Sequence, residues 1–392
     1  MSNRPDPDLL DPYFYVGDPH PSYRWMRHHE PVYRDEKNAL WGVARMDDLR
    51  AVERDGALFV SSRGYRAIHV PNETSMISKD DPAHAEQRRL VSARFTPRAV
   101  ASREAEIREI VVAAIERVRP YGAMEVVNAL AARIPATLTC RLLGFPDRCW
   151  RLLDDWSARL MRVDLTLRDA AVLNDSRQAM LDLGELAAEV LAARRREPRD
   201  DLMSIWAHAS LGARPMDFET IWFELGLVIP GGVDTTRTTI SRALILLEER
   251  PELLERMARE PACIPGAVEE LLRYITPLNN MFRTAVADAE LGGRKIRSGD
   301  RLCLLYASAN RDEAFFERPD ELDFDRDPNP HIAFGLGTHF CLGANLARVT
   351  LRVFFEELAQ RVCDLRALAP PEYEANVFIK GVTRFDLALR SR

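Results

Sequence analysis

A short stretch around Cys341 constrains this 392-residue chain more than any other part of it. It reads Phe-Gly-Leu-Gly-Thr-His-Phe-Cys-Leu-Gly over residues 334–343, and an apolar helical run follows over 344–358. Glycines let a backbone pass close to a large flat ligand, where a side chain would collide. Backbone N–H groups and the start of a helix stabilise a cysteine thiolate. The pattern therefore predicts a thiolate directed at a metal.

Two other interpretations of this stretch fail on spacing. A dinucleotide-binding Gly-x-Gly-x-x-Gly pattern starting at Gly335 requires glycine at position 340, which is Phe340. A structural zinc site requires further paired ligands, and the chain has no Cys-x-x-Cys. A buried cysteine in a glycine-rich turn is the remaining alternative, and it is the usual role of an isolated cysteine.

The order Phe-Gly-x-Gly-x-His-x-Cys-x-Gly resembles the cysteine-ligand loop of the cytochrome P-450 superfamily. The resemblance covers roughly the whole chain. It implies a mainly α-helical (α+β) fold of triangular outline, with small β-sheets, as a single domain over residues 1–392. In that family the thiolate binds the iron of haem b and favours O–O cleavage. The resemblance thus assigns Cys341 as the iron ligand and places His339 against the haem.

A long apolar helical pattern over Phe218–Arg250 is interrupted by Pro230-Gly231-Gly232. Within a helix these residues cost on the order of 3 kcal/mol for the proline and 1 kcal/mol per glycine. Such a sequence is typical of a helix that opens or lets a ligand approach. Pro230 also departs from the family, which usually has a non-proline residue there. It removes a backbone hydrogen bond to the Gly226 carbonyl.

The next residues, Asp234-Thr235, resemble the acid–alcohol pair of the family's oxygen-binding groove. By this match Thr235 would hydrogen-bond dioxygen and Asp234 would help to relay protons. The alternative is a kinked core helix in which both side chains bond their own backbone.

Four residues resemble the family's partners of the haem propionates. His84 and Arg88 stand one helical turn apart, so two donors share one face, and arginine binds a carboxylate with a planar fork. Arg283 and His339 match the remaining two partners, although a lone arginine is more often a solvated surface charge.

Glu270 and Arg273 are spaced i, i+3 and are neighbours on one helix face. A surface ion pair is the ordinary interpretation of such spacing. Their segment resembles the family's Glu-x-x-Arg helix, whose buried pair supports the cysteine loop. We therefore expect a structural pair.

The charge and composition of the chain limit the classes of function and location to be considered. A net charge of −6 and a pI near 5.9 give no reason to expect nucleic-acid binding. The N-terminal Met1–Pro12 is polar and proline-rich, so we expect it to be flexible. No apolar stretch is long enough to cross a membrane, and the six cysteines lack a disulfide-like spacing. A cytoplasmic monomer is expected.

Periodicity predicts mostly helices. The expected helices are 83–95, 98–118, 130–143, 175–196, 218–250, 266–274 and 344–358. The expected strands are 32–34, 40–44, 291–296, 302–305 and 385–389.

The function implied is a haem-dependent monooxygenase that inserts one atom of O2 into a hydrophobic small molecule. The chain has no nicotinamide, flavin or iron–sulfur motif, so electrons are expected from a ferredoxin and its reductase. Arg88, Arg348 and Arg352 are candidates for the docking surface of that partner. Two other classes stay open: a peroxide-driven haem enzyme and a non-catalytic haem sensor.

The substrate class is expected to be a sterol, terpenoid or branched lipid, by likeness to such members of the family. The candidate pocket residues are Val228, Gly231, Leu278, Asn279, Met281 and Phe378. The alternative is a natural-product tailoring oxidase for hydroxylation, desaturation or oxidative coupling. In that case Asn279 and Asn280 would orient a polar group of the substrate.

Overall fold

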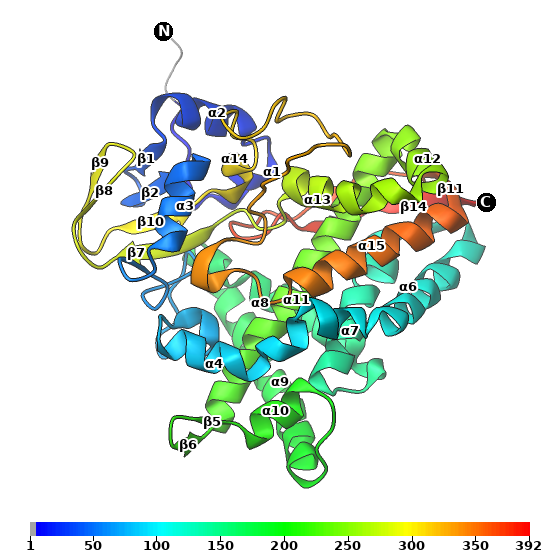
Figure 1. The fold of residues 1–392 in the computed structure, drawn as a ribbon, viewed down its shortest axis with the longest axis horizontal. Helices are drawn as coiled ribbons and strands as arrows, with labels where there is room; N and C mark the ends of the chain where they lie inside the picture. The colour runs from blue at the N-terminus through cyan, green and yellow to red at the C-terminus, as the bar shows by residue number, and fades with distance from the viewer. Residues whose placement is uncertain (1–4) are drawn as a thin grey trace.

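The computed structural model describes residues 5–392, and they form mainly α-helices with several small β-sheets, as the sequence predicts. In Figure 1 the outline is roughly triangular. Helices occupy the lower and right-hand parts, and the largest sheet lies at the upper left. Among the described residues no helix is long and apolar enough to cross a membrane.

The largest sheet positions one wall of the site described below. Its strand order is β1-β2-β10-β7-β3, with β2 and β10 parallel and the other neighbours antiparallel. The strands are β1 Val32–Asp35, β2 Leu40–Val43, β3 Phe59–Val60, β7 Met281–Ala285 and β10 Arg301–Leu304. Since side chains alternate along a strand, Met281 and Arg283 lie on the same side of β7.

The other sheets are smaller and lie at the edges of the helical part. Their strands are β11 Val362–Ala367, β14 Asp386–Ser391 and β4 Ala123–Glu125, then the pairs β12 Glu372–Tyr373 with β13 Val382–Arg384, β5 Ser210–Leu211 with β6 Arg214–Pro215, and β8 Ala289–Leu291 with β9 Arg294–Ile296.

Two large apolar clusters of the described residues form most of the core, and α11 contributes to both. The helices are α1 Pro12–Val16, α2 His20–His29, α3 Met46–Arg54, α4 Ala83–Ser92, α5 Pro97–Ala101, α6 Glu104–Val118, α7 Arg133–Leu143, α8 Trp150–Met161, α9 Ala171–Arg196, α10 Leu202–His208, α11 Phe218–Glu249, α12 Pro251–Arg259, α13 Ile264–Ile275, α14 Tyr306–Ala309 and α15 Ala344–Arg361.

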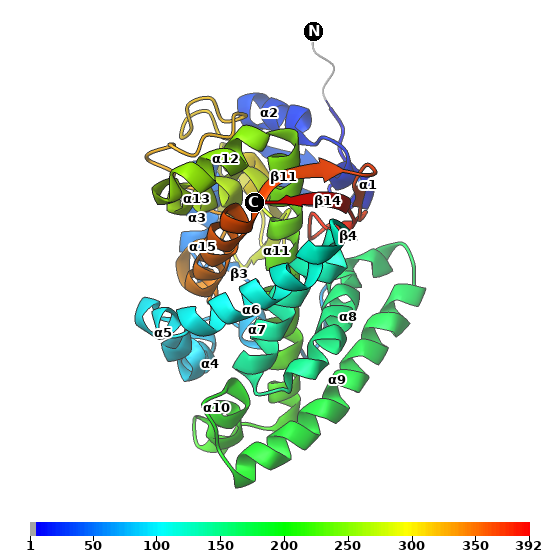
Figure 2. The ribbon, with the colours of Figure 1, turned by 90° about the vertical axis from the view of Figure 1, so that its right-hand side faces the viewer.

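Helix α11 is the axis around which the other helices pack. It has 32 residues and is about 48 Å long at 1.5 Å per residue. Asp217 caps its start by accepting a hydrogen bond from the Thr220 N–H at 2.8 Å. In Figure 2 it runs vertically through the middle of the molecule, with α7 and α8 beside it. Pro230 lies inside it without ending it.

The structure refines several expected elements. The run 98–118 is split into α5 and α6, and 83–95 ends as a 3₁₀ turn after Ser92. The run 130–143 begins as a π-helical turn over Val127–Ala131. The expected strand 291–296 is instead the hairpin β8–β9, because Gly292 and Gly293 adopt positive φ angles and turn the chain back.

The N-terminal stretch differs in part from the expectation of flexibility. Residues 1–4 lie outside the described part of the chain. Leu9 is completely buried, and its N–H donates to Asp35 at 2.9 Å. Asp11 caps α1. Packing against the large sheet therefore holds this polar, proline-rich segment in place from Leu9 onwards.

Candidate haem site

A large cavity lies between the loop that carries Cys341 and the middle of α11. Gly231 and Thr235 of α11 line it on one side, and Cys341 lines it on the other. A Cβ atom added to Gly231 would meet nothing within 4 Å. The helix backbone is therefore open to a ligand at this point, as the Pro-Gly-Gly sequence indicates.

Backbone geometry fixes the cysteine loop. The Cys341 N–H donates to the Phe334 carbonyl at 2.9 Å, which closes the loop just before α15. Gly335 and Gly337 have φ angles of +70° and +71°. A Cβ atom on Gly337 would lie 2.2 Å from the carbonyl oxygen of Glu53, so only glycine fits there.

The Cys341 side chain faces this cavity. Burial raises the pKa of its thiol, while the Gly343 N–H and the guanidinium groups of Arg88 and Arg348 lower it. Those three groups are positioned to stabilise a thiolate once a metal draws the sulfur into that form.

Cationic and imidazole side chains gather at one edge of the cavity: His84, Arg88, Arg283 and His339 all line it. The two imidazole rings lie 4.2 Å apart between centroids. Burial lowers the pKa of both, that of His339 to about 2, so both rings are neutral near pH 7. Arg88 donates to the Phe340 carbonyl at 2.6 Å, and the buried Arg283 donates to the Phe282 carbonyl at 2.8 Å.

Glu53 is a cavity residue that the sequence analysis missed. Only 5% of it is exposed, and its Oε1 accepts from the Tyr306 hydroxyl at 2.5 Å. The Arg283 guanidinium lies 3.8 Å from the same oxygen. Burial raises the pKa of Glu53 to about 7. Its burial could have been predicted from the sequence, because it lies four residues after Leu49 and so falls on the apolar face of α3.

The acid and the alcohol of α11 lie differently with respect to the cavity. Thr235 lines it, and its hydroxyl donates to the Gly231 carbonyl at 2.8 Å. Asp234 does not line it and is 1% exposed. Its carboxylate accepts from the Ser157 hydroxyl at 2.7 Å and pairs with Arg237.

Arg237 also donates to Asp154 of α8 at 2.8 Å, so α11 and α8 share an Asp–Arg–Asp arrangement in which Asp234 is buried and the other two are partly buried. Ser157, Arg237 and Asp154 are not predicted from the sequence. Direct contact between Asp234 and a ligand in the cavity would require Asp234 to leave these partners.

Five of the six candidate pocket residues line the cavity: Val228, Gly231, Leu278, Met281 and Phe378. The sixth, Asn279, is not among the residues that line it. It is fully buried, and its amide donates to the backbone carbonyls of Asn376 and Val377, each at 3.2 Å. Asn280 likewise donates to the Val377 carbonyl, at 2.9 Å. The NH2 groups of both side chains join two loops, while both Oδ1 atoms are buried without a hydrogen-bond partner among the described residues.

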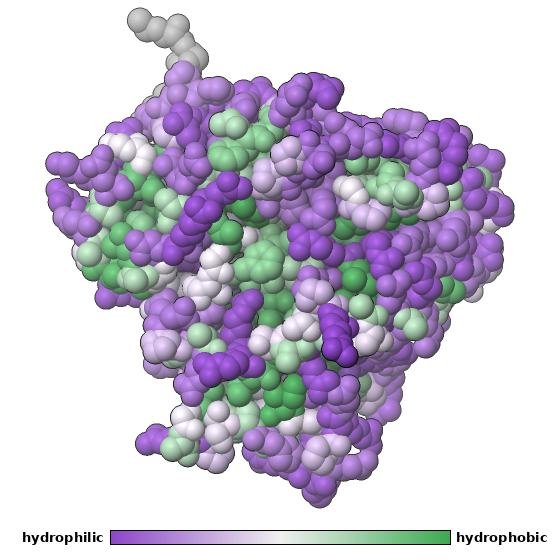
Figure 3. Space-filling model, in the orientation of Figure 1, coloured by the Kyte–Doolittle hydropathy of each residue, from purple (hydrophilic) through white to green (hydrophobic). Residues whose placement is uncertain are grey.

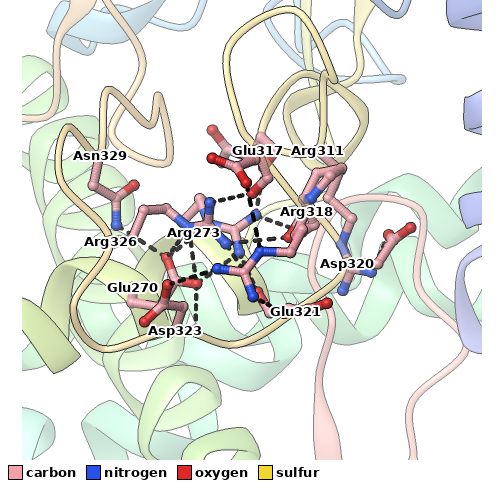
Figure 4. A network of polar contacts seen from close by, with 12 residues as sticks. Glu270, Arg273, Arg311, Glu317, Arg318, Asp320, Glu321, Asp323, Arg326 and Asn329 are labelled. Carbon is pink, nitrogen blue, oxygen red and sulfur yellow. Dashed lines mark hydrogen bonds and ion pairs between the residues drawn. The ribbon is translucent and has the colours of Figure 1, made fainter.

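Glu270 and Arg273 form a two-pronged pair, with N···O distances of 2.8 and 2.7 Å, and neither is exposed. Figure 4 shows further side chains converging on them from the loop before the cysteine stretch. Arg326 and Asn329 both bond Glu270. Arg273 donates to the carbonyls of Asn310, Pro319 and Glu321. The pair therefore organises residues 310–329.

The arginines expected to receive a redox partner are not free charges. Arg348 binds Glu269 with two contacts of 2.8 and 2.9 Å, and Arg352 binds both Glu104 and Glu356 at 2.6 Å. Arg88 lines the cavity. The pairs with Glu269 and Glu104 join different helices, which the linear sequence does not reveal, and the docking surface stays a prediction. The face in Figure 3 is mostly hydrophilic, with apolar side chains near its middle, where Figure 1 places the loop before α15.

The residues present fit a haem. A flat ligand needs an open cavity with little side-chain intrusion, and Gly231 provides this on α11. Its carboxylates need cationic partners, and Arg88 and Arg283 are arranged at one edge. Its iron needs a soft axial ligand, and the Cys341 sulfur faces the same space.

Comparisons with known proteins agree with this geometry. The profile of the cytochrome P-450 family matches residues 159–362. A steroid C26-monooxygenase of Mycolicibacterium smegmatis is 35% identical over 97% of this chain and 95% of its own length. A linalool 8-monooxygenase of Pseudomonas putida is 30% identical and covers 98% of each chain.

Solved structures give the same picture. A cytochrome P-450 of Mycobacterium marinum in complex with pseudoionone has a TM-score of 0.91 and 32% identity, over 99% of this chain and 100% of its own. A Bacillus megaterium cytochrome P-450 in complex with testosterone has a TM-score of 0.88 and 28% identity, over 96% of this chain and 99% of its own. This chain belongs to the cytochrome P-450 family, and it is a monooxygenase whose cofactor is a haem with a thiolate-bound iron.

Proposed function

We propose that this enzyme hydroxylates a steroid-like or terpenoid-like molecule with electrons from a ferredoxin and its reductase. The observation that carries the substrate class is the part of the cavity wall built from Val228, Leu278, Met281 and Phe378. Such a wall favours a largely hydrophobic ligand. The similarity to a steroid C26-monooxygenase and to a linalool 8-monooxygenase supports this class.

Each site residue has a part in the proposal. Cys341 holds the iron, and Arg88 and Arg283, with the neutral imidazoles of His84 and His339, hold the haem carboxylates. When bound, the haem supplies the activation of dioxygen and the oxidation of the substrate. The Thr235 hydroxyl lies on the cavity wall, where it can pass a proton from the interior of α11.

In this scheme Asp234 lies behind Thr235 and helps to relay protons. Its carboxylate is held by Ser157 and Arg237, so proton transfer to the cavity passes through a rearrangement of that pair or through the Thr235 region. The acid–alcohol pair supports the redox-driven class over the peroxide-driven one.

The natural-product alternative loses its main structural support, because Asn279 and Asn280 bond backbone carbonyls. Two other polar residues of the cavity wall are also engaged. Tyr65 donates to Glu73 at 3.1 Å, and Arg66 donates to Asp164 at 2.8 Å.

An optical titration of the ferric protein tests the substrate class. Sterols, terpenoids, fatty acids and aromatic polyketides are added, and the haem absorption reports loss of the iron-bound water. We expect a saturable shift with sterols or terpenoids, weakened by Val228→Phe, which fills the cavity. The control Leu181→Phe, at an exposed position on α9, leaves the shift unchanged. Saturation only with polyketides would reject the proposal.

The electron source is tested with Thr235→Ala. With ferredoxin, its reductase and NADPH, the variant should consume electrons but release peroxide in place of product. A peroxide-driven enzyme would show nearly unchanged peroxide-supported turnover. NADPH consumption without product in the wild type would favour a non-catalytic haem protein.

A further inference from the structure

Glu53 of α3 is a buried acid at the cationic edge of the cavity that the mechanism above does not use. Its Oε1 accepts from Tyr306 of α14, and the Leu336 N–H also approaches the carboxyl group. Its Oε2 is buried and makes no hydrogen bond of good geometry among the described residues. A buried carboxyl oxygen without a partner is energetically costly, because it has lost its hydrogen bonds to water. A ligand in the cavity would supply the missing partner.

The chemistry of the surroundings indicates which form of Glu53 a ligand meets. The charged and titratable groups that face it are Arg283 of β7 and Tyr306 of α14. Burial raises the Tyr306 pKa well above its ordinary value, so its hydroxyl remains a donor to Oε1. When Glu53 is neutral, its proton therefore belongs on Oε2, the atom without a partner. Burial places the pKa of Glu53 near 7, where both forms are accessible.

The charge balance at this edge favours the neutral form when haem is bound. Arg88 and Arg283 are the arginines of this edge, and burial lowers the pKa of the His84 imidazole beside them. A haem brings two carboxylates, so the two guanidinium groups match them only if Glu53 carries no charge. An ionised Glu53 would compete for Arg283 and repel the nearer carboxylate.

We propose that Glu53 is a positioning residue of the haem site: its neutral carboxyl donates from Oε2 to a haem carboxylate that Arg283 also binds, and its ionisation weakens haem binding. The inference rests on the proposed assignment of the haem carboxylates to this edge.

The sign of the pH effect follows from linkage. Haem carboxylates raise the pKa of Glu53 above its value without haem, so the added affinity is complete below pH 7. It is lost as the pH rises through the higher value of the holoenzyme. A rise of about one pKa unit on haem binding gives roughly a tenfold loss of affinity.

The test is haem transfer from the ferric holoenzyme to excess apomyoglobin, followed by absorbance between pH 6 and 9. In the wild type we expect about tenfold faster haem loss at pH 9 than at pH 6. Glu53→Gln keeps an acceptor for Tyr306 and a donor for the carboxylate, so its rate should stay slow and nearly independent of pH. The infrared absorption of unionised carboxylic acid in the wild-type holoenzyme at pH 6 should decrease by one group in this variant, while Glu224 keeps its own contribution.

The matched control is Glu224→Gln. Glu224 is another buried acid whose pKa burial raises to about 7, but it bonds Gln87 and the Met76 N–H and does not line the cavity. This variant should keep the wild-type pH profile of haem loss. A wild-type profile in Glu53→Gln, or a flat profile in the wild type, overturns the proposal.

The variant Arg283→Gln distinguishes a failure of the Glu53 proposal from a failure of the proposed position of the haem carboxylates. Faster haem loss at every pH in Arg283→Gln, together with an unaltered profile in Glu53→Gln, would retain the carboxylate edge and reject only Glu53. No change in Arg283→Gln would reject both.

Discussion

Glu270 and Arg273 are completely buried, and the five N–H donors of Arg273 have five acceptor contacts: two with Glu270 and three with backbone carbonyls. Removing one partner from such a pair leaves an uncompensated buried charge, which is strongly destabilising. The same two residue types at a surface would contribute little, because water screens them.

Replacing Glu270 by glutamine should therefore lower the free energy of unfolding by about 3–5 kcal/mol, as for other broken buried pairs. Urea denaturation followed by circular dichroism measures it. Glu260→Gln is the control, because Glu260 pairs with Arg256 and Arg259 at the surface and should cost less than about 1 kcal/mol. Similar small losses in both variants would contradict a structural role for Glu270.

At the scale of the element, α11 combines an unbroken helix with three residues that oppose helix formation. Gly231 faces the open cavity, whereas a Cβ atom on Gly232 would lie 3.1 Å from the Thr139 hydroxyl oxygen of α7. Glycine is therefore favoured at these two adjacent positions for different structural reasons. Gly231 leaves room for a ligand, and Gly232 permits close packing of α7 on α11.

Gly231→Ala should raise the free energy of unfolding of the haem-free protein by roughly 1 kcal/mol, because alanine has the better helix propensity and its methyl group meets no neighbour. Gly232→Ala is the matched comparison and should gain less or lose stability, since Thr139 has to shift. Thermal unfolding of both variants decides between them. Equal gains would show that packing against α7 does not limit position 232.

Pro230 lies in the same helix and lines the cavity. Pro230→Ala restores an N–H that can bond the Gly226 carbonyl, so the helix should tighten beside the cavity. We expect a changed ratio of product formed to NADPH consumed. Unchanged coupling with unchanged substrate affinity would show that the proline only replaces a distortion already present.

At the scale of the whole molecule, buried acids set the response to pH in two separate windows. Burial raises the pKa of Glu53 and of Glu224 from 4.5 to about 7. The stability each contributes is complete below pH 4.5 and is lost as the pH rises through 7. The pKa of Glu269 shifts in the opposite direction. Burial raises it, but the contacts with His331 and Arg348 outweigh burial and lower it from 4.5 to about 2. Its contribution is complete above pH 4.5 and is lost as the pH falls through 2.

Glu224→Gln should therefore reduce the fall in unfolding free energy between pH 4.5 and 8, by up to about 3 kcal/mol. Urea unfolding at several pH values measures it. Glu219→Gln, at an exposed position in the first turn of the same helix, should keep the wild-type pH profile. An unchanged profile in Glu224→Gln would mean that Glu224 stays ionised in the folded protein.

The parts of the site that sequence could predict are local in the chain. The glycines, cysteine and following helix of the Cys341 loop lie within a few residues of one another, and backbone geometry joins them. The limits of α11 are confirmed to within one residue, because a long apolar period and a capping Asp217 mark them. The i, i+3 spacing of Glu270 and Arg273 is also local, although the loop that bonds them comes from residues 310–329.

The chain by itself determined a thiolate loop, a central helix that opens to a ligand, and the helical fold class, since these follow from backbone propensities and periodicity. Only the tertiary structure decided which polar groups meet: Glu53 with Arg283 and Tyr306, Asp234 with Ser157 and Arg237, and Asn279 with backbone carbonyls in place of substrate. The physical reason is that a buried polar side chain takes whichever partners packing brings within hydrogen-bond distance, and those partners lie tens to hundreds of residues away.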